Sequence, residues 1–265
     1  MFNRIFYFPH KLGQLKDGVD LAPLIMKQFL IPYFSSYELE DTGNMFHNLE
    51  ILYNANNNLE GRRINIGGDH SMSIATVAHT FNTNPNSKII WVDAHADINT
   101  YHSSISKNYH GMPLGFLTGL CKDQNFNFIK NYVPFENILY FGARDLDSFE
   151  RFIIRRNNIE VITMDDINND FNRSIGRVLD FVKDDNLHLS FDVDSMDPKV
   201  IPSTGTPVKC GLSLEEGKSL LDVLLKKSNV YNVDITELNL DIGNTKDKIK
   251  SLHNTFSLFE NYFEF

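Results

Sequence analysis

Short apolar segments alternate along this chain with amphipathic ones, and this alternation limits the fold more than any other feature. The candidate strands are nearly continuous in apolar character and cover residues 5–8, 63–66, 88–92, 137–141, 160–163, 188–191 and 232–235. Helical patterns fall between them, at residues 21–29, 71–80, 113–119, 146–157, 172–183, 213–226 and 245–262. Strands that are apolar on both faces and alternate with helices predict an α/β fold, with a parallel sheet covered by helices on both sides.

Capping and turn residues mark some of the element boundaries. Ser213 followed three residues later by Glu216 is typical of a helix start, because the two side chains can cap backbone N–H groups reciprocally. The Asn-rich segments 54–58 and 82–86 predict solvated loops, since Asn favours turns over regular backbone pairing. No linker divides the sequence, which predicts one domain over residues 1–265.

The composition is typical of a globular protein outside the membrane. Of the 265 residues, 42% are apolar, yet no uncharged apolar run approaches the ~18 residues that span a bilayer. The formal net charge of −9 and the lack of a dense basic block argue against nucleic acid or an anionic membrane as partner. Cys121 and Cys210 lie far apart, and Pro9 and Lys11 interrupt the apolar start before a signal peptide could form. We therefore expect a reducing, cytoplasmic location.

Ionisable residues gather directly after two of the predicted strands. The segment GGDHS at residues 67–71, which contains His70, follows strand 63–66 and by itself is typical only of a tight strand-to-helix turn. Strand 88–92 is followed by Asp93, His95 and Asp97, which an extended backbone would place on one side of the chain. A solvated polar turn would explain either segment taken alone.

A third group follows strand 188–191, where Asp192 and Asp194 again share one side of an extended chain. Because parallel strands deliver their carboxyl ends to one edge of the sheet, we expect the three groups to converge. They would repel and desolvate one another unless a cation lay between them. Two imidazoles and four carboxylates are too many for one zinc ion and suit two hard divalent ions, with manganese favoured by the oxygen-rich set. The candidate ligands are His70, Asp93, His95, Asp97, Asp192 and Asp194.

Seven motifs in order along the chain resemble the ureohydrolase family, and within it the arginases. They are GGDHS at 67–71, DAHADIN at 93–99, HGMP at 110–113, GARDLD at 142–147, SFDVDSMDP at 190–198, TGTP at 204–207 and DITEL at 234–238. The resemblance implies a three-layer α/β/α fold around a parallel sheet of about eight strands. It also implies a centre of two Mn²⁺ ions per subunit, at which a metal-bridging hydroxide attacks the guanidinium carbon of L-arginine to give L-ornithine and urea.

The same resemblance assigns roles to individual residues. One manganese would be held by His70, Asp93, Asp97 and Asp192, and the other by Asp93, His95, Asp192 and Asp194. His110 corresponds to the proton-shuttling histidine, which suits a group that titrates near neutral pH. Asp97 and Asp194 also count among the catalytic residues. The residues expected to contact the substrate are Asn99, Ser106, Asp147, Glu150, Thr206 and Glu237, with Glu237 on the guanidinium group.

Other activities remain open at this point. The loop residues Asn99, Ser106 and Asp147 carry less information than the metal ligands, so agmatine or another guanidino compound is an alternative substrate. A zinc deacetylase of related fold would use fewer carboxylates. A catalytically silent, metal-binding regulatory protein with the same fold is a further alternative. The resemblance also suggests a homo-oligomer, a trimer or hexamer, but only residues 238–265 follow Glu237, so the oligomeric state is open too.

Overall fold

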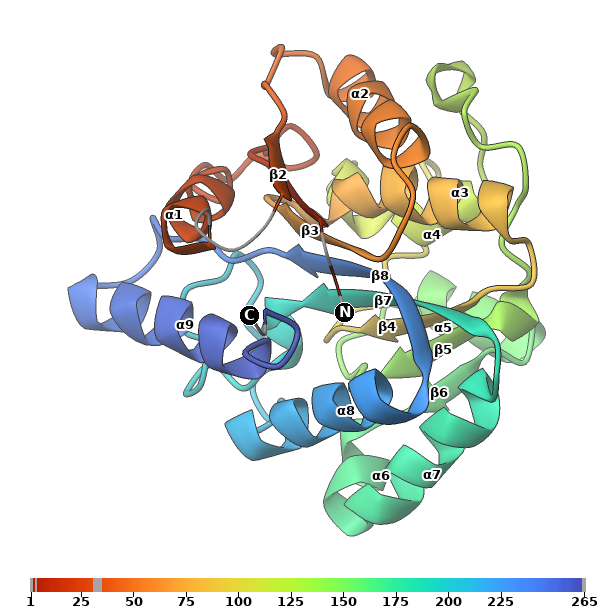
Figure 1. Cartoon of the computed structure of the whole chain (residues 1–265). Helices are drawn as coiled ribbons and strands as arrows, with labels where there is room; N and C mark the ends of the chain where they lie inside the picture. Colours follow the sequence, from red (N-terminus) through yellow and green to blue (C-terminus); the bar gives the residue numbers. More distant parts are fainter. Residues whose placement is uncertain (1, 3, 31–34, 264–265) are drawn as a thin grey trace.

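The computed structural model describes residue 2, residues 4–30 and residues 35–263. Eight strands in these ranges form one sheet in the order β2-β1-β3-β8-β7-β4-β5-β6, and every neighbouring pair is parallel (Figure 1). The strands are β1 (Arg4–Phe8), β2 (Ser35–Glu38), β3 (Arg63–Gly67), β4 (Lys88–Val92), β5 (Ile138–Phe141), β6 (Glu160–Ile162), β7 (Asn186–Asp192) and β8 (Asn229–Thr236). The predicted parallel sheet is confirmed.

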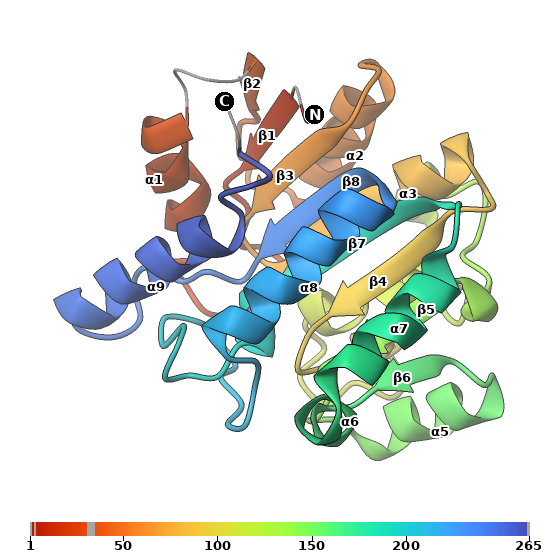
Figure 2. The same ribbon diagram turned by 60° about the horizontal axis from the view of Figure 1, so that its bottom comes forward.

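In β1, β4 and β5, alternate residues enter two separate apolar cores, one on each face of the sheet. In β4, Ile90 and Val92 belong to the first core, whereas Ile89 and Trp91 belong to the second, as side-chain alternation requires. The first core packs α1 (Leu21–Leu30), α6 (Met164–Asn169), α7 (Phe171–Val182), α8 (Leu214–Lys227) and α9 (Thr245–Leu258). The second packs α2 (Met45–Asn57), α3 (Ser73–Thr83), α4 (Pro113–Leu117) and α5 (Ser148–Arg156). Figures 1 and 2 show α2 and α3 on the opposite side of the sheet from α8, which confirms the three-layer architecture.

The helix start predicted at Ser213 is present. The Ser213 side chain accepts a hydrogen bond from the Glu216 amide, and the Glu216 carboxylate accepts one from the Ser213 amide. Helix α8 then buries Leu220, Leu221 and Leu224 against the sheet, so capping and an apolar stripe act together.

Three elements were not predicted: β2, α2 and α6. Strand β2 consists of the polar sequence SSYE at the edge of the sheet, next to β1, so it lacks the apolar pattern of a strand covered on both faces. Helix α6 has only six residues and begins with a reciprocal cap between Thr163 and Asp166. Neither element is long enough to show a clear hydrophobic period.

The prediction of solvated loops at residues 54–58 and 82–86 is wrong for residues 54–57, which belong to α2, and 82–83, which belong to α3, whereas residues 84–86 do lie outside helices and strands. Helix α2 runs through Asn57, and the buried Asn56 amide donates to the Leu52 carbonyl and to Asn65 Oδ1. Asn82 lies in α3 and its amide donates to the Tyr53 hydroxyl at 3.0 Å. These Asn side chains have buried polar partners, which local propensity does not reveal.

The four central strands, β3, β8, β7 and β4, are neighbours in the sheet. Their carboxyl ends therefore lie side by side, at the edge where ligand sites of open α/β sheets form. The expected convergence of the three ionisable groups follows from this strand order. None of the helices in the described ranges is both long and apolar enough to cross a membrane.

Candidate metal centre and adjoining cavity

A tight turn after β3 carries His70 into the site. A Cβ atom on Gly68 would overlap the carbonyl oxygen of His10, so only glycine allows this close approach of two backbones. Asp69 then caps the single 3₁₀ turn formed by residues 70–72, accepting from the Ser71 amide at 3.0 Å. His70 is thereby fixed at the carboxyl end of β3, fully buried.

The backbone after β4 bends instead of continuing as a strand. Asp93 Oδ1 accepts a hydrogen bond from the His95 amide at 2.8 Å, and Asp97 has a left-handed φ of 50°. Asp194 likewise lies in a 3₁₀ turn, and its amide donates to Asp192 Oδ1 at 2.8 Å. We expected side-chain alternation in an extended backbone to place these side chains together. That reason is wrong, because Asx-type turns orient them instead.

The six candidate ligands nevertheless converge. His70 Nδ1 lies 3.2 Å from Asp93 Oδ2, 3.1 Å from Asp97 Oδ2 and 3.1 Å from Asp192 Oδ2. His95 Nδ1 lies 3.4 Å from Asp93 Oδ1 and 3.1 Å from Asp194 Oδ2. Two groups able to hold a metal ion result, one of His70, Asp93 and Asp97 and one of Asp93, His95 and Asp194. Asp93 belongs to both and presents a different oxygen to each histidine.

The surroundings of His70 fit a metal ligand. Its Nδ1 is buried and has no hydrogen-bond partner among the described residues, whereas Nε2 lies 2.8 Å from Ser190 Oγ. Ser73 Oγ lies 3.3 Å from Ser190 Oγ and donates to Asp234 Oδ2 at 2.8 Å. An ionised carboxylate only accepts hydrogen bonds, so Ser73 donates to Asp234 and Ser190 donates to Ser73. His70 Nε2–H then donates to Ser190. The Nδ1 lone pair then faces the carboxylates, which is the tautomer that metal binding requires.

Trp91, the only tryptophan of the chain, contacts two of the candidate ligands, His70 and Asp93. Its indole Nε1 donates to Asp93 Oδ2 at 2.9 Å. Its ring stacks on the His70 imidazole with centroids 4.2 Å apart and planes 10° apart. The rotamers of both ligands are therefore held before any ion binds.

Burial and mutual repulsion perturb the carboxylates of this cluster. Burial, with the charges of Asp194 and Asp93, holds the pKa of Asp192 well above its usual value. Burial and the Asp93 charge raise the pKa of Asp97 to about 6, and the same two causes raise the pKa of Asp194. Burial would also raise the pKa of Asp93, but contacts with His70 and His95 outweigh it and lower that pKa. Positive charge placed among these groups would relieve the repulsion.

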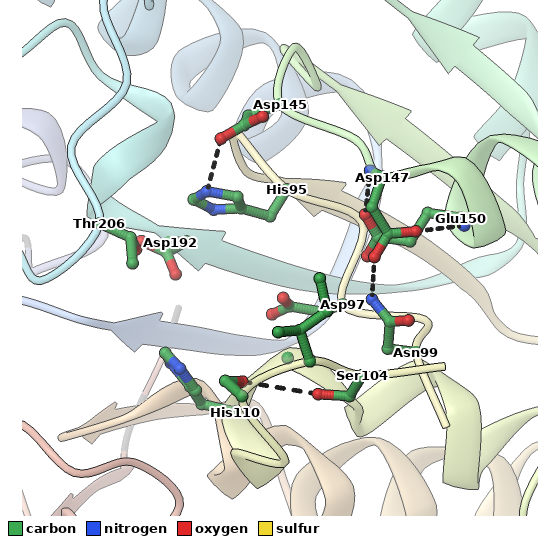
Figure 3. A pocket seen from close by; sticks show the side chains of 13 residues that line it. His95, Asp97, Asn99, Ser104, His110, Asp145, Asp147, Glu150, Asp192 and Thr206 are labelled. Carbon is green, nitrogen blue, oxygen red and sulfur yellow. Dashed lines mark hydrogen bonds and ion pairs between the residues drawn. The ribbon is translucent and has the colours of Figure 1, made fainter. Parts of the chain in front are cut away.

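A cavity of about 370 Å³ opens beside the cluster (Figure 3). It is lined by His95, Asp97, Asn99, Ser104, Ile105, Ser106, His110, Gly111, Asp145, Asp147, Glu150, Asp192 and Thr206. The predicted catalytic His110 lies on this wall, together with the five predicted loop contacts, Asn99, Ser106, Asp147, Glu150 and Thr206. The structure thus brings all of these residues to one cavity.

Several cavity residues hold one another in place. Asp147 Oδ2 accepts from the Asn99 amide at 2.8 Å (Figure 3), and Asp147 forms a reciprocal cap with Glu150 at the start of α5. Burial raises the pKa of Glu150 to about 7. Thr206 Oγ1 donates to Asp194 Oδ2 at 2.8 Å, so it also contacts the ligand cluster.

Glu237, directly after β8, connects the ligand cluster to His110. Its carboxylate Oε1 accepts from the His70 amide at 2.9 Å and from His110 Nδ1 at 3.0 Å. Burial alone would lower the pKa of His110, but the Glu237 carboxylate raises it to about 9. Glu237 is 1% exposed and has a left-handed φ of 66°, a conformation that its neighbours must hold in place.

The predicted set lacked Gln14, Trp91 and Ser190, which contact the predicted site residues, and Ser104, Ile105, Gly111 and Asp145, which line the cavity. Ser190 lies in a buried strand, which is a detectable signal, because a hydroxyl there needs a partner. Gln14 lies in an irregular segment, and its amide donates to Glu237 Oε2 at 2.8 Å. No local pattern marks it, since this contact joins residues 223 positions apart.

Comparison with known proteins agrees with this geometry. The arginase of Schizosaccharomyces pombe is 34% identical over 280 residues, which cover 92% of this chain and 86% of that protein. The crystal structure of Entamoeba histolytica arginase in complex with L-ornithine matches with a TM-score of 0.88 and 29% identity, covering 100% of this chain and 99% of that one.

The sequence match to the arginase of Glaciozyma antarctica is 41% identical over 192 residues and covers 68% of this chain. That match spans 55% of the relative, so the chain spans about half the length of this curated protein. The model of the Arginase family matches residues 14–256. Because this match covers more than half of the chain and includes every predicted ligand, the protein belongs to the arginase family.

Proposed function

We propose that this protein is a metal-dependent ureohydrolase that converts L-arginine to L-ornithine and urea. The observation that carries the proposal is the pair of ligand groups sharing Asp93, at the wall of a cavity that also presents His110. A relative crystallised with L-ornithine, at a TM-score of 0.88, supports the choice of substrate.

The donor set fits two hard divalent cations, and we propose two Mn²⁺ per subunit. His70, Asp93, Asp97 and Asp192 would hold one ion, and Asp93, His95, Asp192 and Asp194 the other. Both histidines offer Nδ1 to the carboxylate oxygens. Bound ions of this kind supply a water of lowered pKa as nucleophile and neutralise developing negative charge.

Glu237 and His110 would act on the reacting group. A planar guanidinium calls for a carboxylate acceptor, and the buried Glu237 is held ionised by its N–H donors. His110 lies in contact with Glu237 and on the cavity wall, so it is placed to pass a proton to the departing amine. Asp194, which accepts from Thr206, is a second candidate for that proton transfer.

The far end of the cavity would hold the amino-acid head of the substrate. Asn99 and Asp147 contact each other, Glu150 contacts Asp147, and Ser106 also lines the cavity. Asp147 is an acceptor for an α-ammonium group, and the Ser106 hydroxyl and the Asn99 amide are neutral partners for a carboxylate. These contacts would orient the substrate so that its guanidinium reaches the metal end.

One observation favours agmatine as a second candidate substrate. None of the described residues that line the cavity is Lys or Arg, so neither of these side chains would pair with a substrate carboxylate. Agmatine lacks that carboxylate. It would still present its guanidinium to Glu237.

Urea release from L-arginine and agmatine, measured in parallel on protein reloaded with Mn²⁺, decides between them. His95→Ala is the control, because it removes one ligand and leaves the cavity otherwise intact. Arginine turnover that disappears in the variant would support the proposal. A preference for agmatine would reverse the roles given to Asn99, Ser106 and Asp147, and no urea from either substrate would favour the silent metal-binding protein.

A cytoplasmic location and a trimeric or hexameric state complete the proposal. Cys121 and Cys210 are both free thiols, which supports a reducing compartment. Sedimentation of the purified protein measures the oligomeric state.

A further inference from the structure

We infer that Gln14 is a positioning residue, which sets the one carboxylate oxygen of Glu237 that remains open to a guanidinium group. The inference rests on the proposed function of Glu237. It concerns the segment 11–16, to which neither the sequence motifs nor the predicted site residues assign a role.

The segment 11–16 is tied to the site by contacts to three other parts of the chain. The Gly13 amide donates to Asp69 Oδ2 at 2.8 Å, and the Gly13 carbonyl accepts from the His110 amide at 3.1 Å. Lys16 donates to the Gly205 carbonyl. The segment therefore holds the backbone of His110 as well as the side chain of Glu237.

The donors around Glu237 are unequally shared between its two oxygens. Oε1 accepts from both His70 and His110, at 2.9 and 3.0 Å. Within the described residues, the only hydrogen bond to Oε2 comes from Gln14 Nε2, at 2.8 Å. Since a carboxylate oxygen has about two acceptor directions, Oε2 has one direction that no described donor fills. Gln14 decides where that direction points.

The orientation of the Gln14 amide follows from its partner. An ionised carboxylate accepts only, so the NH₂ group and not the amide oxygen must face Glu237. Gln14 is 9% exposed and Glu237 is 1% exposed, so water competes little for this charge-assisted bond. Loss of the hydrogen bond from Gln14 would allow the Glu237 carboxylate to rotate, or allow Oε2 to bind water in place of the substrate.

A matched pair of variants tests the assignment. Gln14→Met keeps an unbranched side chain of similar length and removes the donor, whereas Lys16→Met removes a different side-chain contact of the same segment, to the Gly205 carbonyl. On Mn²⁺-loaded protein we would measure kcat and KM for L-arginine. We would also measure the inhibition constant of L-norleucine, which keeps the amino-acid head and replaces the guanidinium by an apolar end.

We expect Gln14→Met to lower kcat/KM for L-arginine about tenfold, as loss of a hydrogen bond to a charged group does. The inhibition constant of L-norleucine should stay within about twofold of the wild type, because that ligand presents nothing to Glu237. An equal loss for both ligands, or an equal loss in Lys16→Met, would show that the segment only braces the cavity. An unchanged kcat/KM would overturn the inference outright.

Thermal unfolding of the Gln14→Met, Glu237→Gln and double variants gives a readout that needs no turnover. If Gln14 acts through Glu237, the two changes are non-additive. Additive changes would contradict the contact. If wild-type protein releases no urea, the proposed function fails, and calorimetric binding of L-arginine and L-norleucine to the same variants then decides the role of Gln14.

Discussion

The metal end and the far end of the cavity are built in different ways. At the metal end, His70, Asp93 and Asp192 directly follow or end central strands, and each is almost fully buried. Away from the cluster, much of the wall comes from loops, and Ile105 there is 96% exposed. The metal end is therefore fixed by the sheet, whereas the far end depends on loops that hold one another. Variants at the two ends should fail in different ways.

Asp192→Asn should give the largest effect. It should impair the Mn²⁺-loaded protein and stabilise the metal-free protein. With Mn²⁺, urea release should fall by about a thousandfold or more, because this variant removes a buried ligand of the cluster. Without metal, the variant should unfold at a higher temperature, by roughly 3 °C, because the raised pKa shows that the charged carboxylate is destabilised there. Calorimetric unfolding with and without Mn²⁺ checks both signs. A metal-free variant less stable than the wild type would contradict the account of repulsion.

His110→Ala should separate catalysis from metal binding. His110 contacts Glu237, but neither of the two ligand groups includes His110. Turnover should therefore fall about 10²- to 10³-fold, while the Mn²⁺ content per chain stays unchanged. Atomic absorption on dialysed protein, beside the urea assay, measures both. Loss of metal in this variant would move His110 into the cluster.

Ser190→Ala should weaken Mn²⁺ binding by about 10- to 100-fold, because it removes the acceptor that keeps the His70 proton on Nε2. Thr76→Val is the matched control. Thr76 also donates to Asp234 Oδ2, yet it lies outside the chain of hydroxyls that reaches His70. Fluorescence of Trp91, which stacks on His70, reports metal binding directly. Equal weakening in both variants would mean that the hydroxyl chain does not set the tautomer.

Glu150→Gln probes the far end and should leave Mn²⁺ binding intact. The pKa of Glu150 is raised to about 7 in the folded protein, above its ordinary value near 4.3, so its contribution to stability falls as pH rises between these values. The variant should therefore gain stability over the wild type between pH 5 and pH 8, by about 2 kcal/mol. Urea denaturation of the metal-free proteins at both values measures this difference. If the variant and the wild type differ in stability by the same amount at pH 5 and pH 8, Glu150 is already ionised at pH 5.

The predicted sheet and the predicted ligands agree with the structure for a shared reason. Strands such as Lys88–Val92 are buried on both faces, and the apolar run Ile89–Val92 shows it. Charged side chains directly after such strands have few structural explanations. The missed elements lack this signal. The loop prediction at Asn54–Asn57 is wrong because the buried Asn56 contacts Asn65 of β3, a contact that the local sequence does not show.

Local order along the chain determined the α/β class, the ends of the central strands and the identity of six candidate ligands. Only the tertiary structure decided that turns, and not strand alternation, bring Asp97 and Asp194 toward the histidines. It also decided that Gln14, Ser190 and Asp234 hold Glu237 and His70. The physical reason is range: hydrophobic periodicity is written in neighbouring residues, whereas the partner of a buried polar group can come from any point of the chain.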